Sequence, residues 1–154
     1  MNEREPADHE KWMRCALDLA REAGESGEVP VGCVIVAGGE IVGKGRNSPL
    51  VSLDPTAHAE ILAIRQAAFA LTNYRLTEAT IYSTLEPCVM CAGAIVMARI
   101  PKLVFGARDL RFGGVRAKFQ LADSPLLNHQ AEIVEGVLGA EATIMLRQFF
   151  SARR

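Results

Sequence analysis

Residues 79–107 have the sequence ATIYSTLEPCVMCAGAIVMARIPKLVFGA, which decides the class of fold. A short β-branched run over 79–84 predicts a strand, the stretch 88–99 is compatible with a helix, and 102–107 predicts a second strand. Strands that alternate with helices are typical of α/β proteins, in which helices cover both faces of a sheet. Parallel neighbouring strands need a crossover, and this unit can provide one.

Two further elements precede this unit. Apolar side chains recur every three or four positions over 12–23, which predicts an amphipathic helix. Two β-rich runs, 31–37 and 40–45, are separated by Gly38 and Gly39. The permissive backbone of these glycines suits a tight antiparallel hairpin turn.

A second helix is expected over 57–71, opening at His58, because the preceding segment 54–56 (Asp-Pro-Thr) offers a capping side chain and a proline suited to a first turn. Near the end of the chain, 131–137 predicts a strand and 140–151 a closing helix. The interval 108–130 has glycines, basic residues and a proline without clear periodicity. A loop, with at most a short helix, is expected there.

The predicted order of elements is therefore α-β-β-α-β-α-β-β-α. Because the hairpin is antiparallel and the crossover is parallel, the sheet is expected to be mixed. The sequence predicts an α/β fold with three α/β/α layers around a central mixed sheet of about five strands. A single domain over 1–154 is expected, since chains of roughly 100 to 200 residues usually form one hydrophobic core.

Composition excludes several classes of protein. Hydrophobic residues make up 49% and charged residues 23% of the chain, so the sequence does not indicate disorder, collagen or a coiled coil. The N-terminal segment MNEREPADHEKW is charged and leads into no long apolar run, which argues against a secretory signal or a membrane span. A cytoplasmic location is expected. The formal net charge of −1 argues against a protein that coats nucleic acid through a global positive potential.

Positive charge is instead local. Between 108 and 118 four basic residues face a single acid, Asp109, which leaves a local balance of +3. The last eight residues add Arg147, Arg153 and Arg154 without an acid. Such clusters are either solvated surface or a nucleic-acid contact, and charge alone does not decide between them.

Four cysteines are present, and two of them have the spacing of metal ligands. In a reducing compartment Cys15 and Cys33 are best interpreted as buried thiols, whereas Cys88 and Cys91 lie three apart at the start of a predicted helix. With His58 they would provide one imidazole and two thiolates. Three protein ligands and an open fourth position are characteristic of catalytic zinc.

Glu60 is the candidate proton carrier, because a carboxylate beside a metal-activated water can accept its proton and pass it to the substrate. Positions two apart point to nearly opposite sides of an ideal helix. Glu60 can therefore serve beside His58 only at the helix end. Two alternatives remain open: a redox dithiol formed by Cys88 and Cys91, and a purely structural zinc site.

The combination H-A-E followed by P-C-x-x-C resembles the H-x-E and P-C-x-x-C pattern of zinc nucleobase deaminases. Across almost its whole length the chain is also similar to the bacterial tRNA-specific adenosine deaminases. The matching segments are VPVG at 29–32, DPTAHAE at 54–60, NYRL at 73–76, TLEPCVMCAGA at 84–94 and FGARD at 105–109.

This resemblance implies a cytidine-deaminase-like fold and one zinc ion per subunit, with His58, Cys88 and Cys91 as ligands and Glu60 as the catalytic residue. It implies hydrolytic deamination of adenosine at the first anticodon position of tRNA, by a homodimer whose active sites lie near the interface. Asn47 matches the asparagine that holds the target base.

Asp109 matches the aspartate near the sugar of the preceding nucleotide. Arg108 and Phe149, with the basic loop and the last helix, are candidates to contact phosphates and stack on bases of an unpaired anticodon loop. Phe149 and Phe150 are equally compatible with core packing. Two rival functions remain: deamination of free guanine or nucleosides, and a non-catalytic, zinc-stabilised RNA-binding subunit.

Overall fold

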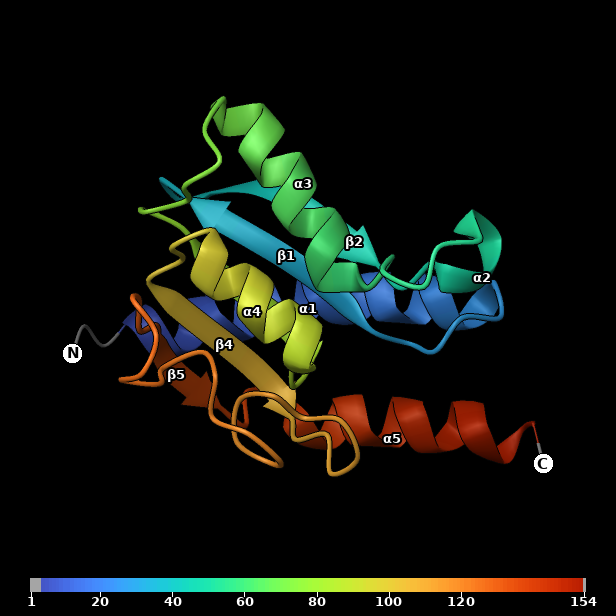
Figure 1. Cartoon of the computed structure of the whole chain (residues 1–154). Coiled ribbons are helices and arrows are strands. Elements are labelled where there is room, and N and C mark those ends of the chain that lie inside the picture. Colours follow the sequence, from blue (N-terminus) through green and yellow to red (C-terminus); the bar gives the residue numbers. More distant parts are fainter. Residues whose placement is uncertain (1–3, 154) are drawn as a thin grey trace.

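A five-stranded sheet organises the chain, with the strands in the order β2-β1-β3-β4-β5 (Figure 1). The computed structural model describes residues 4–153. The strands are β1 (Gly32–Ala37), β2 (Glu40–Arg46), β3 (Thr80–Leu85), β4 (Lys102–Ala107) and β5 (Glu132–Glu135). The helices are α1 (Arg4–Glu25), α2 (Pro49–Ser52), α3 (Ala59–Leu71), α4 (Val89–Met97) and α5 (Gly139–Ser151).

The sheet is mixed, as the sequence predicted. Strand β1 pairs antiparallel with both β2 and β3, whereas β3, β4 and β5 run parallel. Gly38 and Gly39 form the hairpin turn with φ angles of 60° and 76°, which glycine adopts without steric cost. Helix α4 provides the crossover between β3 and β4.

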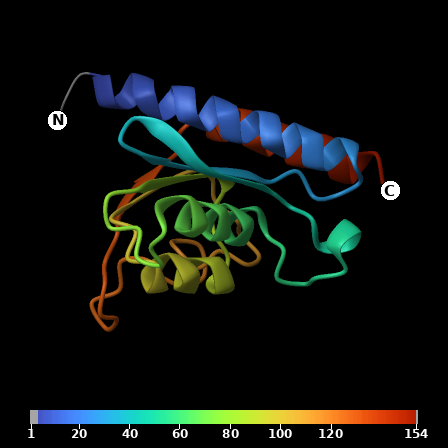
Figure 2. The same ribbon diagram turned by 90° about the horizontal axis from the view of Figure 1, so that it is seen from above.

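Helices cover both faces of the sheet, which confirms the three-layer prediction. Helices α1 and α5 lie on one face, and α3 and α4 lie on the other (Figure 2). The side chains of β1 alternate between the two cores: Cys33 and Ile35 pack with α3 and α4, while Val34 and Val36 pack with α1. Because both faces of β1 are buried, its sequence is continuously apolar instead of alternating.

Several boundaries differ from the sequence prediction. Helix α1 begins upstream of 12–23, because the apolar periodicity marks only the part that faces the core. The short helix α2 was not expected. Strand β5 is shorter than the predicted 131–137, and residues 108–131 form turns without a helix. None of the helices in the described part of the chain is long and apolar enough to cross a bilayer.

Candidate active site

The beginnings of α3 and α4 meet at one end of the sheet. His58 is the N-cap residue of α3 and Cys88 is the N-cap residue of α4, and neither side chain forms a capping hydrogen bond. Cys91 lies in the first turns of α4 and is buried. Gly45 of β2 allows the close approach of α3, since a Cβ atom there would overlap the carbonyl oxygen of Ala59. The three side chains are therefore positioned by regular structure.

The distances fit a tetrahedral zinc ion. The Nδ1 atom of His58 lies 3.5 Å from Sγ of Cys88 and 3.6 Å from Sγ of Cys91. Zinc bonds of about 2.05 Å to nitrogen and about 2.3 Å to sulfur at a tetrahedral angle would separate these atoms by about 3.6 Å. Nδ1 is thus the imidazole atom placed to bind the ion. In the described part of the chain these three residues form the only metal-binding group, with no fourth protein ligand.

A hydrogen bond couples the protonation of the Cys88 and Cys91 thiols. The hydrogen bond from Cys91 lowers the pKa of Cys88 to about 4, and the same hydrogen bond together with burial raises the pKa of Cys91. The hydrogen bond with Cys88 also raises the pKa of His58. A bound metal requires two thiolates and a neutral imidazole, so it would displace these protons.

Glu60 lies in the first turn of α3 and is only 3% exposed. Burial raises the pKa of its carboxyl group to about 7. The helical spacing that separates positions two apart does not apply to His58 and Glu60, because the N-cap residue His58 has extended backbone angles of −74° and 152°. Both side chains line the same cleft. The structure thus brings the four residues of the predicted metal and proton-transfer site together.

The cleft above this corner has a volume of about 680 Å³, within the range of small-molecule sites. Asn47 and Pro49, just after β2, line the cleft, and so do the loop residues 108–112, which we call the loop wall. Leu146 and Phe150 of α5 also line it. The metal corner, formed by His58, Cys88 and Cys91 at the starts of two helices, thus borders a cleft that is lined in part by loop structure.

Asn47 caps α3 from a distant position in the chain. Its Oδ1 atom accepts a hydrogen bond of 2.9 Å from the backbone N–H of Ala59. Because that N–H can only donate, the amide orientation is fixed, and the NH₂ group is left to donate within the cleft. The predicted cap was wrong: Asp54 instead accepts hydrogen bonds from the backbone and hydroxyl of Thr56, in a turn that precedes the helix.

Asp109 and Arg108 both line the loop wall, and both already have protein partners. The Oδ1 atom of Asp109 accepts hydrogen bonds from the backbone N–H groups of Arg111 and Phe112, which forms a tight turn. Arg108 forms a bidentate ion pair with Glu135, at 2.8 Å and 3.1 Å. Their contacts with substrate stay predictions.

Phe149 does not line the cleft. Its ring lies beside Gly24 of α1, with the guanidinium of Arg153 at 3.5 Å from the ring centroid. Phe150, one position further along α5, is 48% exposed and lines the cleft. Since successive helical residues point about 100° apart, the cleft-facing position is Phe150 and not the predicted Phe149.

Sequence reasoning missed two buried glutamates, Glu28 and Glu86, of which Glu86 also lines the cleft. Glu28 accepts hydrogen bonds from the backbone of Leu50 and Val51 in α2, and Glu86 accepts them from the loop after β4. The distance in sequence between each carboxylate and its donors exceeds 20 residues, so no local pattern marks either residue. A single acid amid apolar neighbours, as in T-L-E-P at 84–87, was the only signal.

Residues 6–107 match the family described as the cytidine and deoxycytidylate deaminase zinc-binding region. This match, together with the geometry of the metal corner, defines the class of the protein as a zinc-binding deaminase.

Similarity to individual proteins identifies the family within this class. A tRNA-specific adenosine deaminase of Haemophilus influenzae is 49% identical over 146 residues, which cover 94% of this chain and 84% of that protein. A tRNA:A34 deaminase structure, from studies of A-to-I editing at the wobble position, has a TM-score of 0.85 at 41% identity, covering 88% of this chain and 99% of the other. A guanine deaminase from Nitrosomonas europaea has a TM-score of 0.77 at 25% identity, covering 92% and 84%. The chain belongs to the family of the tRNA-specific adenosine deaminases.

Proposed function

We propose that this protein hydrolyses adenosine to inosine at the first anticodon position of tRNA, with release of ammonia. One observation carries the proposal: the ligand atoms of His58, Cys88 and Cys91 surround a single centre, and Glu60 lines the same cleft. The tRNA-specific deaminases among the relatives support the choice of substrate.

His58, Cys88 and Cys91 would hold one zinc ion per subunit. When bound, zinc acts as a Lewis acid that makes water a nucleophile at neutral pH. Glu60 would accept one proton of the attacking water and deliver it to a ring nitrogen of the purine. It would then move the remaining hydroxyl proton of that water to the amino group, which leaves as ammonia. Glu60 is buried and lines the cleft beside His58 and Cys88. A redox dithiol or a purely structural zinc would leave Glu60 unused, which favours the catalytic role.

Asn47 would hold the target base. Its free NH₂ group can donate a hydrogen bond to an acceptor nitrogen of the purine, while its oxygen stays on α3. Asp109, which also lines the cleft, would lie near the sugar of the preceding nucleotide, as the family resemblance implies. The target base must be unpaired to enter the cleft, and an anticodon loop meets this need.

A second groove, with a volume of about 780 Å³, continues from the cleft and would bind the RNA backbone. Phe150 lines both the cleft and this second groove. Four arginines also line the groove: Arg108, Arg111, Arg147 and Arg153. Guanidinium groups suit phosphate oxygens, and the exposed ring of Phe150 suits stacking on a base. Arg154, the last predicted basic residue, lies outside the described residues.

We also propose a homodimer and a cytoplasmic location, following the family resemblance. Leu110 and Phe112 at the rim of the cleft are 75% and 62% exposed, which supports a partner surface near the active site. Light scattering of the purified protein tests this: twice the monomer mass is expected, and a monomer at assay concentration would contradict it.

The proposal is tested by supplying the purified protein with a tRNA anticodon stem-loop, free adenosine, cytidine and guanine, and measuring inosine and ammonia. Inosine formed in the stem-loop alone is expected. Deamination confined to free guanine, as the similarity to guanine deaminase would allow, overturns the choice of substrate. Zinc-dependent RNA binding without ammonia release would favour the non-catalytic role.

A further inference from the structure

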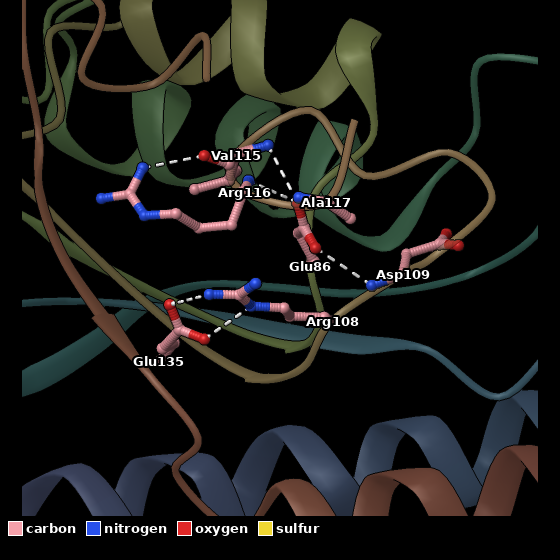
Figure 3. A network of polar contacts seen from close by, with 7 residues as sticks. All are labelled: Glu86, Arg108, Asp109, Val115, Arg116, Ala117 and Glu135. Carbon is pink, nitrogen blue, oxygen red and sulfur yellow. Dashed lines mark hydrogen bonds and ion pairs between the residues drawn. The ribbon is translucent and has the colours of Figure 1, made fainter. Parts of the chain in front are cut away.

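Glu86 is a buried carboxylate that neither the metal corner nor the proposed proton transfer uses. It lies between the end of β3 and Pro87, next to the ligand Cys88, and is 2% exposed. The nearby arginines are directed to other carboxylates: Arg108 pairs with Glu135 and Arg116 pairs with Asp123. Figure 3 shows Arg108 turned toward Glu135 and away from Glu86.

The partners of Glu86 are backbone N–H groups of the loop after β4. Oε1 accepts a hydrogen bond of 3.0 Å from Asp109. Oε2 accepts hydrogen bonds from three consecutive residues, Val115, Arg116 and Ala117, at 3.0, 2.6 and 3.0 Å (Figure 3). One side chain therefore holds both ends of the loop, 109 and 115–117, to the segment that carries the metal ligand.

Two glycines allow the loop to approach this closely. A Cβ atom at Gly113 would overlap the carboxylate of Glu86, and one at Gly114 would lie 2.8 Å from the backbone of Cys88 and Val89. The N–H of Gly114 donates a 2.8 Å hydrogen bond to the carbonyl oxygen of Pro87. The loop thus lies directly against the residues on either side of the ligand.

From this arrangement we infer that Glu86 is a positioning residue, which sets the separation between the metal corner and the loop wall of residues 108–112. The inference rests on the proposed function, because the loop wall is taken to contact the RNA. Asp109 lines the cleft, and its backbone is the partner of Oε1. Loss of the carboxylate frees this wall without removing a group that touches the metal.

The substitution Glu86→Gln removes the negative charge of the side chain but keeps its size and shape. The amide retains one acceptor oxygen, but its NH₂ group must face either Asp109 or the three N–H groups at 115–117, all of which can only donate. The loop must then move away from the 86–88 segment. Glu132→Gln is the matched control, because Glu132 is an exposed carboxylate of β5 whose side chain is 67% accessible.

Hydrogen exchange, zinc content and deamination of the stem-loop are measured together on each variant. For Glu86→Gln we expect faster exchange of the amides at 109–117, unchanged exchange in α4, stoichiometric zinc, and kcat/KM lowered at least about tenfold, mainly through KM. Glu132→Gln should match the wild type. Gly113→Ala, which displaces the loop and leaves the carboxylate intact, should reproduce the effects of Glu86→Gln.

Unchanged loop exchange and unchanged kcat/KM in Glu86→Gln would overturn the inference. A loss of zinc that parallels the loss of activity in Glu86→Gln and Gly113→Ala would also overturn it. Glu86 would then support the metal corner itself. A double-mutant cycle with Asp109→Asn adds a second criterion: the effects should be less than additive, and full additivity would contradict a path through the loop. A wild-type protein that forms no inosine would refute the proposed function, while the exchange data still test the hold of Glu86 on the loop.

Discussion

The metal corner and the loop wall border the same cleft, but they are built differently. At the corner, His58 and Cys88 are N-cap residues of two helices that pack on the sheet. The wall at 108–112 has no regular structure and is held through its backbone by Glu86. From this difference we expect the chemical step to take place at the rigid corner. We expect the RNA to be recognised by the loop, which the helices and the sheet hold in position.

The largest expected effect comes from removing a ligand at the rigid side. In His58→Ala, Cys88→Ala or Cys91→Ala the site loses one of only three protein ligands, so zinc content should fall and inosine formation should drop to the detection limit. Metal analysis by mass spectrometry and the stem-loop assay measure both. Cys33→Ala, a buried cysteine of the sheet, is the control and should keep its zinc. Full zinc in all three ligand variants would contradict the assignment.

The next effect separates the two tasks of Asn47. Asn47→Asp keeps an oxygen for the N–H of Ala59 but loses the NH₂ donor, whereas Asn47→Ala loses both. A lost hydrogen bond of about 1–3 kcal/mol lowers kcat/KM by about fivefold to 150-fold in both variants. Only Asn47→Ala should also lose about 1 kcal/mol of stability with the helix cap. Urea unfolding and the stem-loop assay distinguish the variants, and equal activity in Asn47→Asp and the wild type would remove Asn47 from base recognition.

A smaller effect is expected on the recognition side. Arg147→Ala should raise KM for the stem-loop and reduce the slope of log affinity against log salt by about 1, because one phosphate contact is lost. Arg65→Ala removes the same charge from α3, on the other face of the sheet, and should leave the slope unchanged. Identical slopes in the two variants would argue against RNA binding in the second groove, which is lined by residues of α5.

The smallest effect concerns the part of the loop beyond the cleft. The guanidinium of Arg116 holds the pKa of Asp123 below its usual value through a hydrogen-bonded ion pair. The stability from this pair is present above the ordinary carboxyl pKa of about 4 and is lost as the pH falls through the lowered value. Urea midpoints of the wild type and Asp123→Asn should therefore differ at pH 7, and the difference should shrink as the pH falls below about 4. A constant difference at every pH would show that the pair contributes nothing through charge.

The metal corner could be predicted from sequence because its signals are local. His58 and Glu60 are two residues apart, and Cys88 and Cys91 are three apart, so the pattern of residue types contains the chemistry. The layers of the fold could be predicted in the same way, because the periodicities of strands and helices are visible in short stretches of sequence. The mixed sheet followed from the glycine pair at 38–39 and the crossover at 88–99.

A loop at 108–130 was predicted, but the contacts that hold the loop wall in place could not be, because they join distant residues. Glu86 binds amides 23 to 31 positions later, and Asn47 caps a helix 12 positions later. Neither bond leaves a pattern in the intervening sequence. The choice between Phe149 and Phe150 depended on the rotation of α5 about its axis, and the helical period alone did not determine it.

The account depends most on Glu60 acting as the proton carrier beside a zinc ion held by His58, Cys88 and Cys91. The direct measurement compares the wild type and Glu60→Ala for inosine formed in the stem-loop and for zinc bound per subunit. We predict equal zinc in both proteins and a rate of inosine formation at least about a hundredfold lower in Glu60→Ala. Comparable rates in the two proteins, with zinc bound to each, would contradict the account.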